Sequence, residues 1–192
     1  MRTTDDMLNA IKAKGVMRAS ELSSFVSTRT QLRRYVDSGF LIALGSGIYA
    51  HPELDPFTAA VVAVARYYPS AVISNVTAMV IHGLSDERID RIDVDIPRDK
   101  SIRNKLIRAH RVAKEHIVGL IHQSFHGHKI QIYTRERTLC DAYHLDPEGP
   151  LFLKAIKRYV KSKEVDSDTI AFFDKVLKTN VLRSLTQELA DE

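Results

Sequence analysis

Residues 27–50 read STRTQLRRYVDSGFLIALGSGIYA and join a basic stretch to a short apolar one. Thr28 and Gln31 have the spacing of a capping box at the start of a helix. Gly39 suits the left-handed position just past a helix end. Together these signals predict a helix over about residues 28–38.

The predicted helix is amphipathic. Leu32, Tyr35 and Val36 recur at helical spacing and form the face that is expected to pack on a core. The polar residues of the opposite face and its flanks are Arg29, Thr30, Arg33, Arg34 and Asp37. One face of the helix is therefore available to a partner.

The sequence around this helix predicts a winged helix-turn-helix. Apolar residues at helical spacing indicate helices over about 4–14 and 21–25, the second capped by Ser20. Apolar, β-prone residues on both sides of residues 45–47 predict two strands joined by a tight glycine-bearing turn. In such a domain the third helix enters the major groove of DNA and the hairpin, called the wing, lies near the sugar-phosphate backbone.

This geometry defines a set of candidate DNA contacts. They comprise the major-groove residues Thr30, Arg33 and Arg34, the phosphate or flanking residues Arg29 and Gln31, and the wing-tip residues Ser46 and Gly47. Two alternatives stay open, because exposed arginines are commonly a solvated face and because some winged helices bind proteins instead of DNA. Asp37 on the same face and the neutral Ser46 in the wing weigh against DNA.

The composition fits a globular protein with a mild excess of positive charge. The chain has 192 residues, of which 44% are hydrophobic, with a formal charge of +4 and a pI near 9.2. A polyanionic partner is compatible with this balance but does not follow from it. Cys140 is the one cysteine, which excludes an intramolecular disulfide and fits a reducing compartment. The first residues lack an apolar signal core and no apolar run is long enough to span a bilayer, so we expect a cytoplasmic protein without membrane contact.

The remaining chain mixes helix and strand signals. They predict a helix from Pro56, a helix over about 75–82 and a strand over about 91–96. Gly127 predicts a turn between two further strands. The expected fold is therefore α+β, with a winged helix-turn-helix over 1–52 and a mixed α/β domain with C-terminal helices over 53–192.

Three blocks of the sequence resemble a known family. The residues that carry the resemblance are Arg29, Leu32, Gly39, Leu41, Gly47 and Tyr49, then Ser74, Thr77, Ala78, His82, Gly83 and Leu84, then Tyr133, Arg135, Glu136, Arg137, Thr138 and Asp141. In this order they are similar to the AbiEi antitoxins of type IV toxin-antitoxin, or abortive-infection, systems, over about residues 5–145.

The resemblance implies a function and two partners. It implies a transcriptional repressor that binds inverted repeats in its own promoter, on double-stranded DNA, and a C-terminal domain linked to neutralising a nucleotidyltransferase-like toxin. Self-association on DNA is also compatible with such a repressor. Many relatives have an arginine before the wing glycine where this chain has Ser46, so more of the DNA contact is expected from the third helix.

A second basic segment covers residues 98–114. Its cations include Arg98, Lys100, Arg103, Lys105, Arg108 and Arg111, and Asp99 is the one acidic residue among them. It could follow phosphates, bind an acidic protein, or be a solvated loop. No aromatic residue interleaves with it, which argues against stacking on single-stranded bases.

The sequence offers little for catalysis. Asp93 and Asp95 alternate on one strand as in a nucleotidyltransferase, but the glycine turn of that superfamily precedes its helix, and we expect these carboxylates to be exposed on an edge strand. His122, His126 and His128 could converge on a metal but lack a fourth ligand. Cys140 is expected to be buried and inert. We therefore expect no enzyme activity, no metal and no cofactor.

The C-terminal helices carry apolar stripes. Phe152, Ile156 and Tyr159 lie on one side of the first of them, opposite a row of lysines. Asp166 or Ser167 is expected to cap the next helix. Such stripes serve either as core or as a dimer interface, and the sequence leaves both open.

Overall fold

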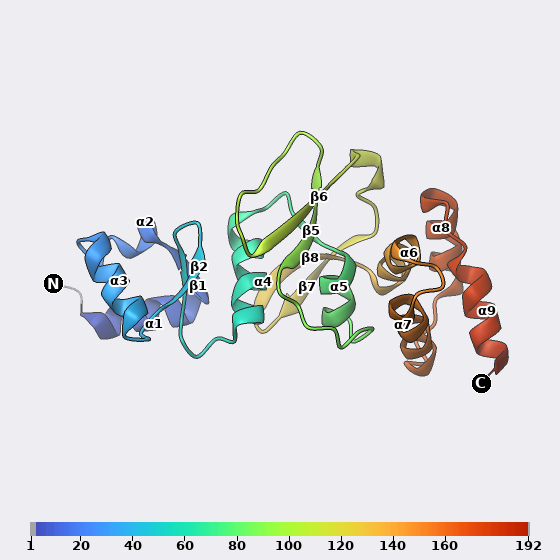
Figure 1. The fold of residues 1–192 in the computed structure, drawn as a ribbon, viewed down its shortest axis with the longest axis horizontal. Helices are drawn as coiled ribbons and strands as arrows, with labels where there is room; N and C mark the ends of the chain where they lie inside the picture. Colours follow the sequence, from blue (N-terminus) through green and yellow to red (C-terminus); the bar gives the residue numbers. More distant parts are fainter. Residues whose placement is uncertain (1–2, 192) are drawn as a thin grey trace. The chain divides into compact units, whose positions relative to one another are not determined.

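The computed structural model describes residues 3–191 and has an α+β fold, as the sequence predicts at this level (Figure 1). Two sheets are present in this part of the chain, one of three strands and one of five. The chain divides into two compact units. The first comprises residues 1–69, 102–107 and 124–130, and the second comprises residues 70–101, 108–123 and 131–192.

The first unit begins with three helices and a small sheet. Its elements are α1 (Thr4–Lys14), β1 (Val16–Arg18), α2 (Ala19–Leu22), α3 (Arg29–Asp37), β2 (Ile42–Gly45), β3 (Ile48–Ala50) and α4 (Pro56–Tyr67). The sheet order is β1-β3-β2, with both pairs antiparallel. Val16 of β1 and Ile42 of β2 both pair with Ala50 of β3, so β3 is the central strand and β1 lies on the side of it opposite β2.

The predicted bounds of the first and third helices are confirmed. The Thr3 hydroxyl accepts a hydrogen bond from the backbone N–H of Asp6 at 3.2 Å and caps α1. The Thr28 hydroxyl accepts one from the N–H of Gln31 at 3.2 Å and caps α3. Gly39 has φ of +75°, the left-handed conformation expected of it.

The predicted second helix was wrong in its bounds. It begins at Ala19 instead of following Ser20, because β1 pairs with β3 up to Arg18 and the chain turns there into the helix. The N–H of Arg18 donates to the Glu21 carboxylate at 2.8 Å, which caps the first turn. The strand β1 has no local sequence signal, since its partner lies more than thirty residues away.

Two apolar clusters hold the first unit together. One lies among the three N-terminal helices and includes Met7, Ile11, Leu22 and Leu32. The other lies between the sheet and α4 and contains Val16, Leu44, Ile48, Ala50, Ala59, Val62 and Ala63, with Leu106 packed against it. The sequence boundary expected at residue 52 therefore falls inside this unit, since α4 completes its second cluster.

The remaining elements form the five-stranded sheet and the C-terminal helices. They are β4 (Val72–Ile73), α5 (Asn75–Ile81), β5 (Ile92–Pro97), β6 (Ile107–Val112), the 3-10 turn η1 (Lys114–His116), β7 (Leu120–Phe125), β8 (His128–Tyr133), α6 (Arg135–Leu145), α7 (Pro150–Lys161), α8 (Ser167–Leu177) and α9 (Val181–Asp191). The sheet order is β6-β5-β4-β8-β7. It is mixed, because β4 is antiparallel to β5 and parallel to β8.

Two expectations about this sheet were wrong. The strand β5 is not at an edge, because β6 and β4 flank it on either side. Residues 107–112 of the basic segment, for which a solvated loop was one interpretation, form the strand β6, whose first residue Ile107 is buried. Arg108 and Arg111 of β6 lie three residues apart, which breaks the alternation typical of a half-buried strand, so the sequence pattern did not reveal this strand.

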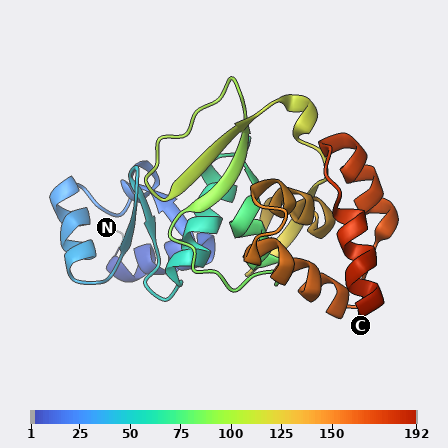
Figure 2. The same cartoon turned by 45° about the vertical axis from the view of Figure 1, so that its right-hand side comes forward.

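The helices α6–α9 pack together as one group in both views (Figure 1 and Figure 2). Their shared core includes Leu139, Phe152, Tyr159, Phe173 and Leu185, so the apolar stripes of α7 and α8 serve as core. The Asp166 carboxylate caps α8 by accepting from the N–H of Thr169 at 2.9 Å, as expected. Within residues 3–191, no helix is both long and apolar enough to cross a lipid bilayer.

Candidate nucleic-acid interface

The helix α3 buries one side and exposes the other, as the sequence predicts. Leu32 is 6% exposed, and Tyr35 and Val36 are half-buried against the same cluster. Four of the predicted DNA-contacting residues are exposed, namely Arg29, Thr30, Arg33 and Arg34. The cationic face thus contributes nothing to the core, and its side chains are free to meet a ligand.

The fifth predicted residue of this helix, Gln31, has structural partners instead. Its side-chain oxygen accepts a hydrogen bond from the N–H of Ser27 at 3.2 Å, and its amide nitrogen donates to the Tyr35 hydroxyl at 3.5 Å. The same hydroxyl bonds to the Thr4 hydroxyl of α1 at 3.0 Å. Gln31 is half-buried and links the start of α3 to the rest of the unit.

The arginines of the exposed face have only weak ion-pair partners or none among the described residues. Arg33 lies 3.7 Å from the Asp37 carboxylate, but their side chains are 84% and 67% exposed, so water competes with this pair. Arg29 and Arg34 form no ion pair with any residue that the structure describes. Two or three positive charges are therefore available on one helix face, with one acidic residue beside them.

The turn between β2 and β3 is tight. Gly45, Ser46 and Gly47 have φ of +80°, +50° and +70°, which accounts for the two glycines. The Ser46 hydroxyl donates to the carbonyl of Arg103 at 3.0 Å, and the carbonyl of Gly47 accepts from the N–H of Ala19 at 2.8 Å. Both predicted wing-tip residues are exposed, and both are hydrogen-bonded to other parts of the unit.

A polar clasp fixes α2 to α4, and sequence reasoning missed it. The Glu21 carboxylate accepts hydrogen bonds from the Arg66 guanidinium at 2.8 Å, from the Tyr67 hydroxyl and from the N–H of Arg18. The guanidinium of Arg18 also lies over the Tyr67 ring, 4.5 Å from its centroid. Burial alone would raise the pKa of Glu21, but these hydrogen bonds and the Arg66 charge lower the pKa to about 2. These hydrogen bonds tie α2, the helix that precedes α3 in the chain, to the end of α4.

The second basic segment is divided between the two units. Arg103 and Lys105 are exposed and belong to the first unit, whereas Arg98, Lys100, Arg108 and Arg111 belong to the second. Arg108 donates to the buried Asp93 carboxylate at 3.4 Å, so part of its charge is balanced.

Asp93 and Asp95 are buried, which corrects the expectation of exposed carboxylates. They are 2% and 4% exposed. His110 and Arg108 of β6 contact the Asp93 carboxylate, with the His110 ring nitrogen at 2.9 Å, and the Tyr133 hydroxyl donates to Asp95 at 3.0 Å. The hydrogen bond to Asp93 raises the pKa of His110. Each carboxylate thus has a hydrogen-bond partner inside the second unit instead of facing solvent, and the Arg137 guanidinium lies 4.0 Å from Asp95.

Arg137 and Asp141 of α6 form a buried pair, the structural contact predicted from their spacing. The Arg137 Nε donates to Asp141 at 3.0 Å, and another nitrogen of the guanidinium donates to the carbonyls of His116 and Val118 at 2.7 and 2.9 Å. The second carboxylate oxygen of Asp141 is buried without a hydrogen-bond partner. Burial raises the pKa of Asp141 to about 6, although the Arg137 charge acts against this.

The other candidate chemical groups are dispersed. His122 and His126 are exposed near the β7–β8 turn and His128 is half-buried, with its ring close to Gly15. Within the described residues, no three His, Cys, Asp or Glu side chains are arranged to hold a metal ion. Burial raises the pKa of Cys140 to about 12, which leaves its thiol protonated and unreactive, as expected.

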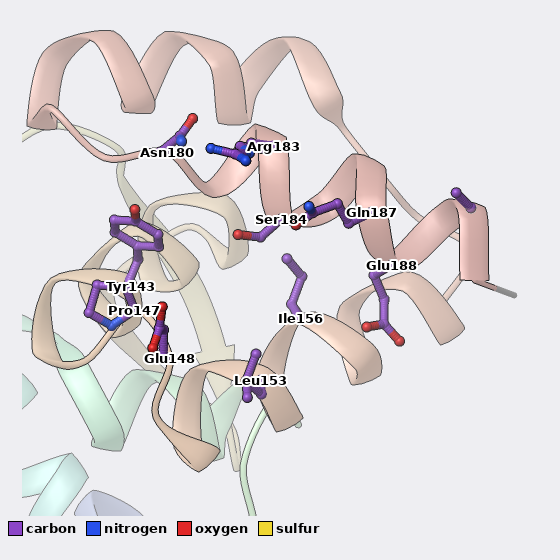
Figure 3. Close-up of a pocket in the computed structure, with 11 residues that line it drawn as sticks. Tyr143, Pro147, Glu148, Leu153, Ile156, Asn180, Arg183, Ser184, Gln187 and Glu188 are labelled. Carbon is purple, nitrogen blue, oxygen red and sulfur yellow. The ribbon is translucent and has the colours of Figure 1, made fainter.

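A groove lies among the C-terminal helices. Its volume is about 730 Å³, and Figure 3 shows side chains of α9 facing those of α7 across it. The lining combines apolar residues such as Leu153 and Ile156 with charges of both signs, Arg183 and Glu188. Nothing in this mixture selects one class of ligand.

Comparison with known proteins adds no assignment. No protein-family model matches the chain, and no curated protein is significantly similar to it.

Proposed function

We propose that this chain is a sequence-specific DNA-binding repressor, that its first unit is a winged helix-turn-helix domain, and that it serves as the antitoxin of a type IV toxin-antitoxin system. The exposed cationic face of α3 is the single observation that carries the DNA-binding proposal. There Arg29, Thr30, Arg33 and Arg34 are all exposed while Leu32 packs beneath them.

The order and pairing of the elements support this proposal. A short helix precedes α3, and the hairpin of β2 and β3 follows it, with β1 closing the sheet. This order is typical of a winged helix, in which the third helix reads base edges in the major groove. Arginine is suited to that task because its guanidinium binds the O6 and N7 atoms of guanine together.

The antitoxin role rests on the resemblance to the AbiEi antitoxins alone. In this proposal the repressor binds inverted repeats in its own promoter, and the second unit takes part in neutralising a nucleotidyltransferase-like toxin. The chain itself has no catalytic task in the proposal. The buried Asp93 and Asp95 support this part, because they are bonded to His110 and Tyr133 and not open to a metal or a nucleotide.

Fluorescence anisotropy tests the DNA-binding proposal. The probes are a duplex from immediately upstream of the gene and a random duplex of equal length, and the proteins are the native chain and an Arg33→Ala/Arg34→Ala variant. We expect the native chain to prefer the upstream duplex, and the variant to lose about 1–3 kcal/mol for each arginine that reads a base. A matched control is Lys157→Ala/Lys161→Ala, which removes equal charge from exposed positions of α7.

Equal binding of both duplexes by the native chain and the Arg33→Ala/Arg34→Ala variant would reject sequence-specific reading by α3. A winged helix that binds a protein would then be the better account, and the exposed Phe40 beside α3 would belong to that interface. The antitoxin role is tested separately by co-expression with a nucleotidyltransferase encoded beside the gene. Rescue of growth is expected, and unchanged toxicity would remove this part of the proposal.

A further inference from the structure

The tip of the β2–β3 hairpin is in contact with a segment far along the chain, residues 102–106. The Ser46 hydroxyl donates to the carbonyl of Arg103 at 3.0 Å. On the other side of the turn, a Cβ atom at Gly45 would lie 3.5 Å from the side-chain oxygen of Asn104. The turn and this segment therefore lie side by side within the first unit.

Asn104 anchors the segment from below. It is 8% exposed, and its side-chain oxygen accepts a hydrogen bond from the N–H of Leu106 at 3.0 Å. Its amide nitrogen donates to the Tyr68 hydroxyl at 3.4 Å. Leu106 packs on the apolar cluster between the sheet and α4. The segment is thus held by one buried polar side chain and one apolar side chain, and its position relative to the turn is fixed.

The anchoring of Asn104 turns its two neighbours outward. Arg103 and Lys105 are both exposed, on either side of Asn104, whose backbone carbonyl accepts a hydrogen bond from the N–H of Ile107 at 3.1 Å and so closes a tight turn. Neither forms an ion pair with a residue between positions 3 and 191. Two unpaired cations therefore stand next to a turn whose own tip residue, Ser46, carries no charge.

We propose that Arg103 and Lys105 bind the phosphate backbone of DNA next to the hairpin turn, and that Ser46 is a positioning residue that holds their segment there. The inference rests on the proposed function, because it assumes that the hairpin approaches DNA as a wing. It reassigns Ser46 from a direct contact to a support. The cations of the wing then come from a segment that is more than fifty residues away in sequence.

Phosphate contacts of this kind have a measurable signature. Each cation that neutralises a phosphate releases counterions, so the logarithm of the association constant falls with the logarithm of salt concentration by about 0.9 per contact on duplex DNA. The Arg103→Ala/Lys105→Ala variant should bind the upstream duplex with a salt slope smaller by about 1.8 than that of the native chain. Its preference for the upstream duplex over a random duplex should be unchanged, because phosphate contacts carry no base information.

The control removes two cations from another part of the full-length chain. The variant Lys157→Ala/Lys161→Ala alters exposed residues of α7 and gives the same loss of charge. We expect its salt slope to equal that of the native chain. An equal fall in slope for both double variants would show a general charge effect and would overturn the inference.

Ser46→Gly tests the positioning role without changing charge. Glycine suits the φ of +50° at this position, so the variant loses the hydroxyl without added backbone strain. The slope should fall in the otherwise native chain and should not fall further in the Arg103→Ala/Lys105→Ala background. An independent loss in both backgrounds would show that Ser46 touches DNA itself and would overturn its reassignment.

Asn104→Ala tests the positioning of the segment in a second way. It removes the bonds to Tyr68 and Leu106 that hold residues 102–106 and leaves Arg103 and Lys105 in the chain. A smaller salt slope is expected here too, with thermal unfolding by circular dichroism to confirm that the protein remains folded. A native salt slope in the Arg103→Ala/Lys105→Ala variant, together with lost discrimination in Arg33→Ala/Arg34→Ala, would overturn the inference and leave the proposed function standing. Absence of any preference for the upstream duplex in the native chain would instead reject the proposed function.

Discussion

Arg137 of α6 contacts three separate parts of the second unit. Its guanidinium bonds to Asp141 on its own helix and to the carbonyls of His116 and Val118, and it lies 4.1 Å from the centroid of the Tyr133 ring. The carbonyl contacts take up one of its terminal nitrogens, and Asp141 therefore receives only part of the compensation that a dedicated partner would give. Burial is the main reason why this carboxyl, although it lies beside an arginine, still has a raised pKa, and the charge of Asp95 adds to the effect.

The raised pKa of Asp141 predicts a pH-dependent difference between the native chain and Asp141→Asn. The pKa of Asp141 is about 6 in the folded state against an ordinary value of 3.8, so between these values the folded state binds a proton that the unfolded state has lost. The stability of the native chain relative to Asp141→Asn should therefore fall as pH rises from about 4 to 6, by up to about 3 kcal/mol. Urea denaturation at pH 4, 5, 6 and 7 measures this difference, and a constant difference across the series would contradict the prediction.

Single residues were also where sequence reasoning was weakest. The Arg137–Asp141 spacing predicted a pair, and the pair is confirmed, but Asp93 and Asp95 were expected in solvent. Their strand reads Ile-Asp-Val-Asp-Ile, which is compatible with an amphipathic edge strand. Burial depends on the neighbouring β6, whose His110 neutralises Asp93 across strands. Arg108 and His110 lie at alternate positions of a second β-prone stretch, and this pattern could have indicated that cationic side chains of a neighbouring strand cover Asp93.

At the level of elements, capping residues and glycine stops predicted most helices correctly. α1, α3, α4 and α8 begin where Thr3, Thr28, Asp55 and Asp166 supply a side-chain cap. The elements that were missed, β1 and β6, are strands whose existence depends on partners elsewhere in the chain. The candidate interface shows the same division. The exposed face of α3 follows from helical periodicity, whereas the contact of residues 102–106 with the hairpin turn depends on tertiary structure.

The clasp between α2 and α4 gives a prediction for these elements. Glu21→Ala removes the acceptor for Arg66, Tyr67 and the N–H of Arg18, and it should destabilise the first unit by about 1–3 kcal/mol at pH 7. Because the pKa of Glu21 is lowered to about 2, its contribution is complete above about pH 4.5 and is lost as pH falls toward 2.

Glu53→Ala is the control for this measurement. Glu53 pairs with Lys12 at 2.7 Å, but the two side chains are 67% and 61% exposed, and little change is expected. Urea denaturation followed by circular dichroism compares the three proteins. Equal stability of Glu21→Ala and Glu53→Ala would mean that the clasp adds nothing beyond a surface ion pair.

At the scale of the whole molecule, the first unit is not a contiguous stretch of sequence. Residues 102–107 and 124–130 belong to it together with residues 1–69. Leu106 covers part of its second apolar cluster, and His128 packs so closely on Gly15 that a Cβ there would lie 2.9 Å from the imidazole. No local signal in residues 102–107 or 124–130 predicted this interleaving, and the winged helix-turn-helix was expected to be complete within residues 1–52.

Fragments of the chain test this organisation. A fragment of residues 1–52 lacks α4, which covers Val16, Ile48 and Ala50, and it should unfold without a cooperative transition. A fragment of residues 1–69 restores α4 and should recover part of the dispersion in its proton–nitrogen NMR spectrum. A cooperative transition in the shorter fragment, equal in midpoint to that of the longer one, would contradict the prediction.

The interleaving also bears on how such a protein could change its target during evolution. A unit that is assembled from three separate stretches of sequence cannot be exchanged between relatives by one recombination event, since its supporting segments would stay behind. The exposed residues of α3 carry none of the core and are free to vary one at a time. In a protein of the proposed function, divergence toward new operators would therefore proceed by point substitution on this helix, while the scaffold beneath it is inherited as a whole.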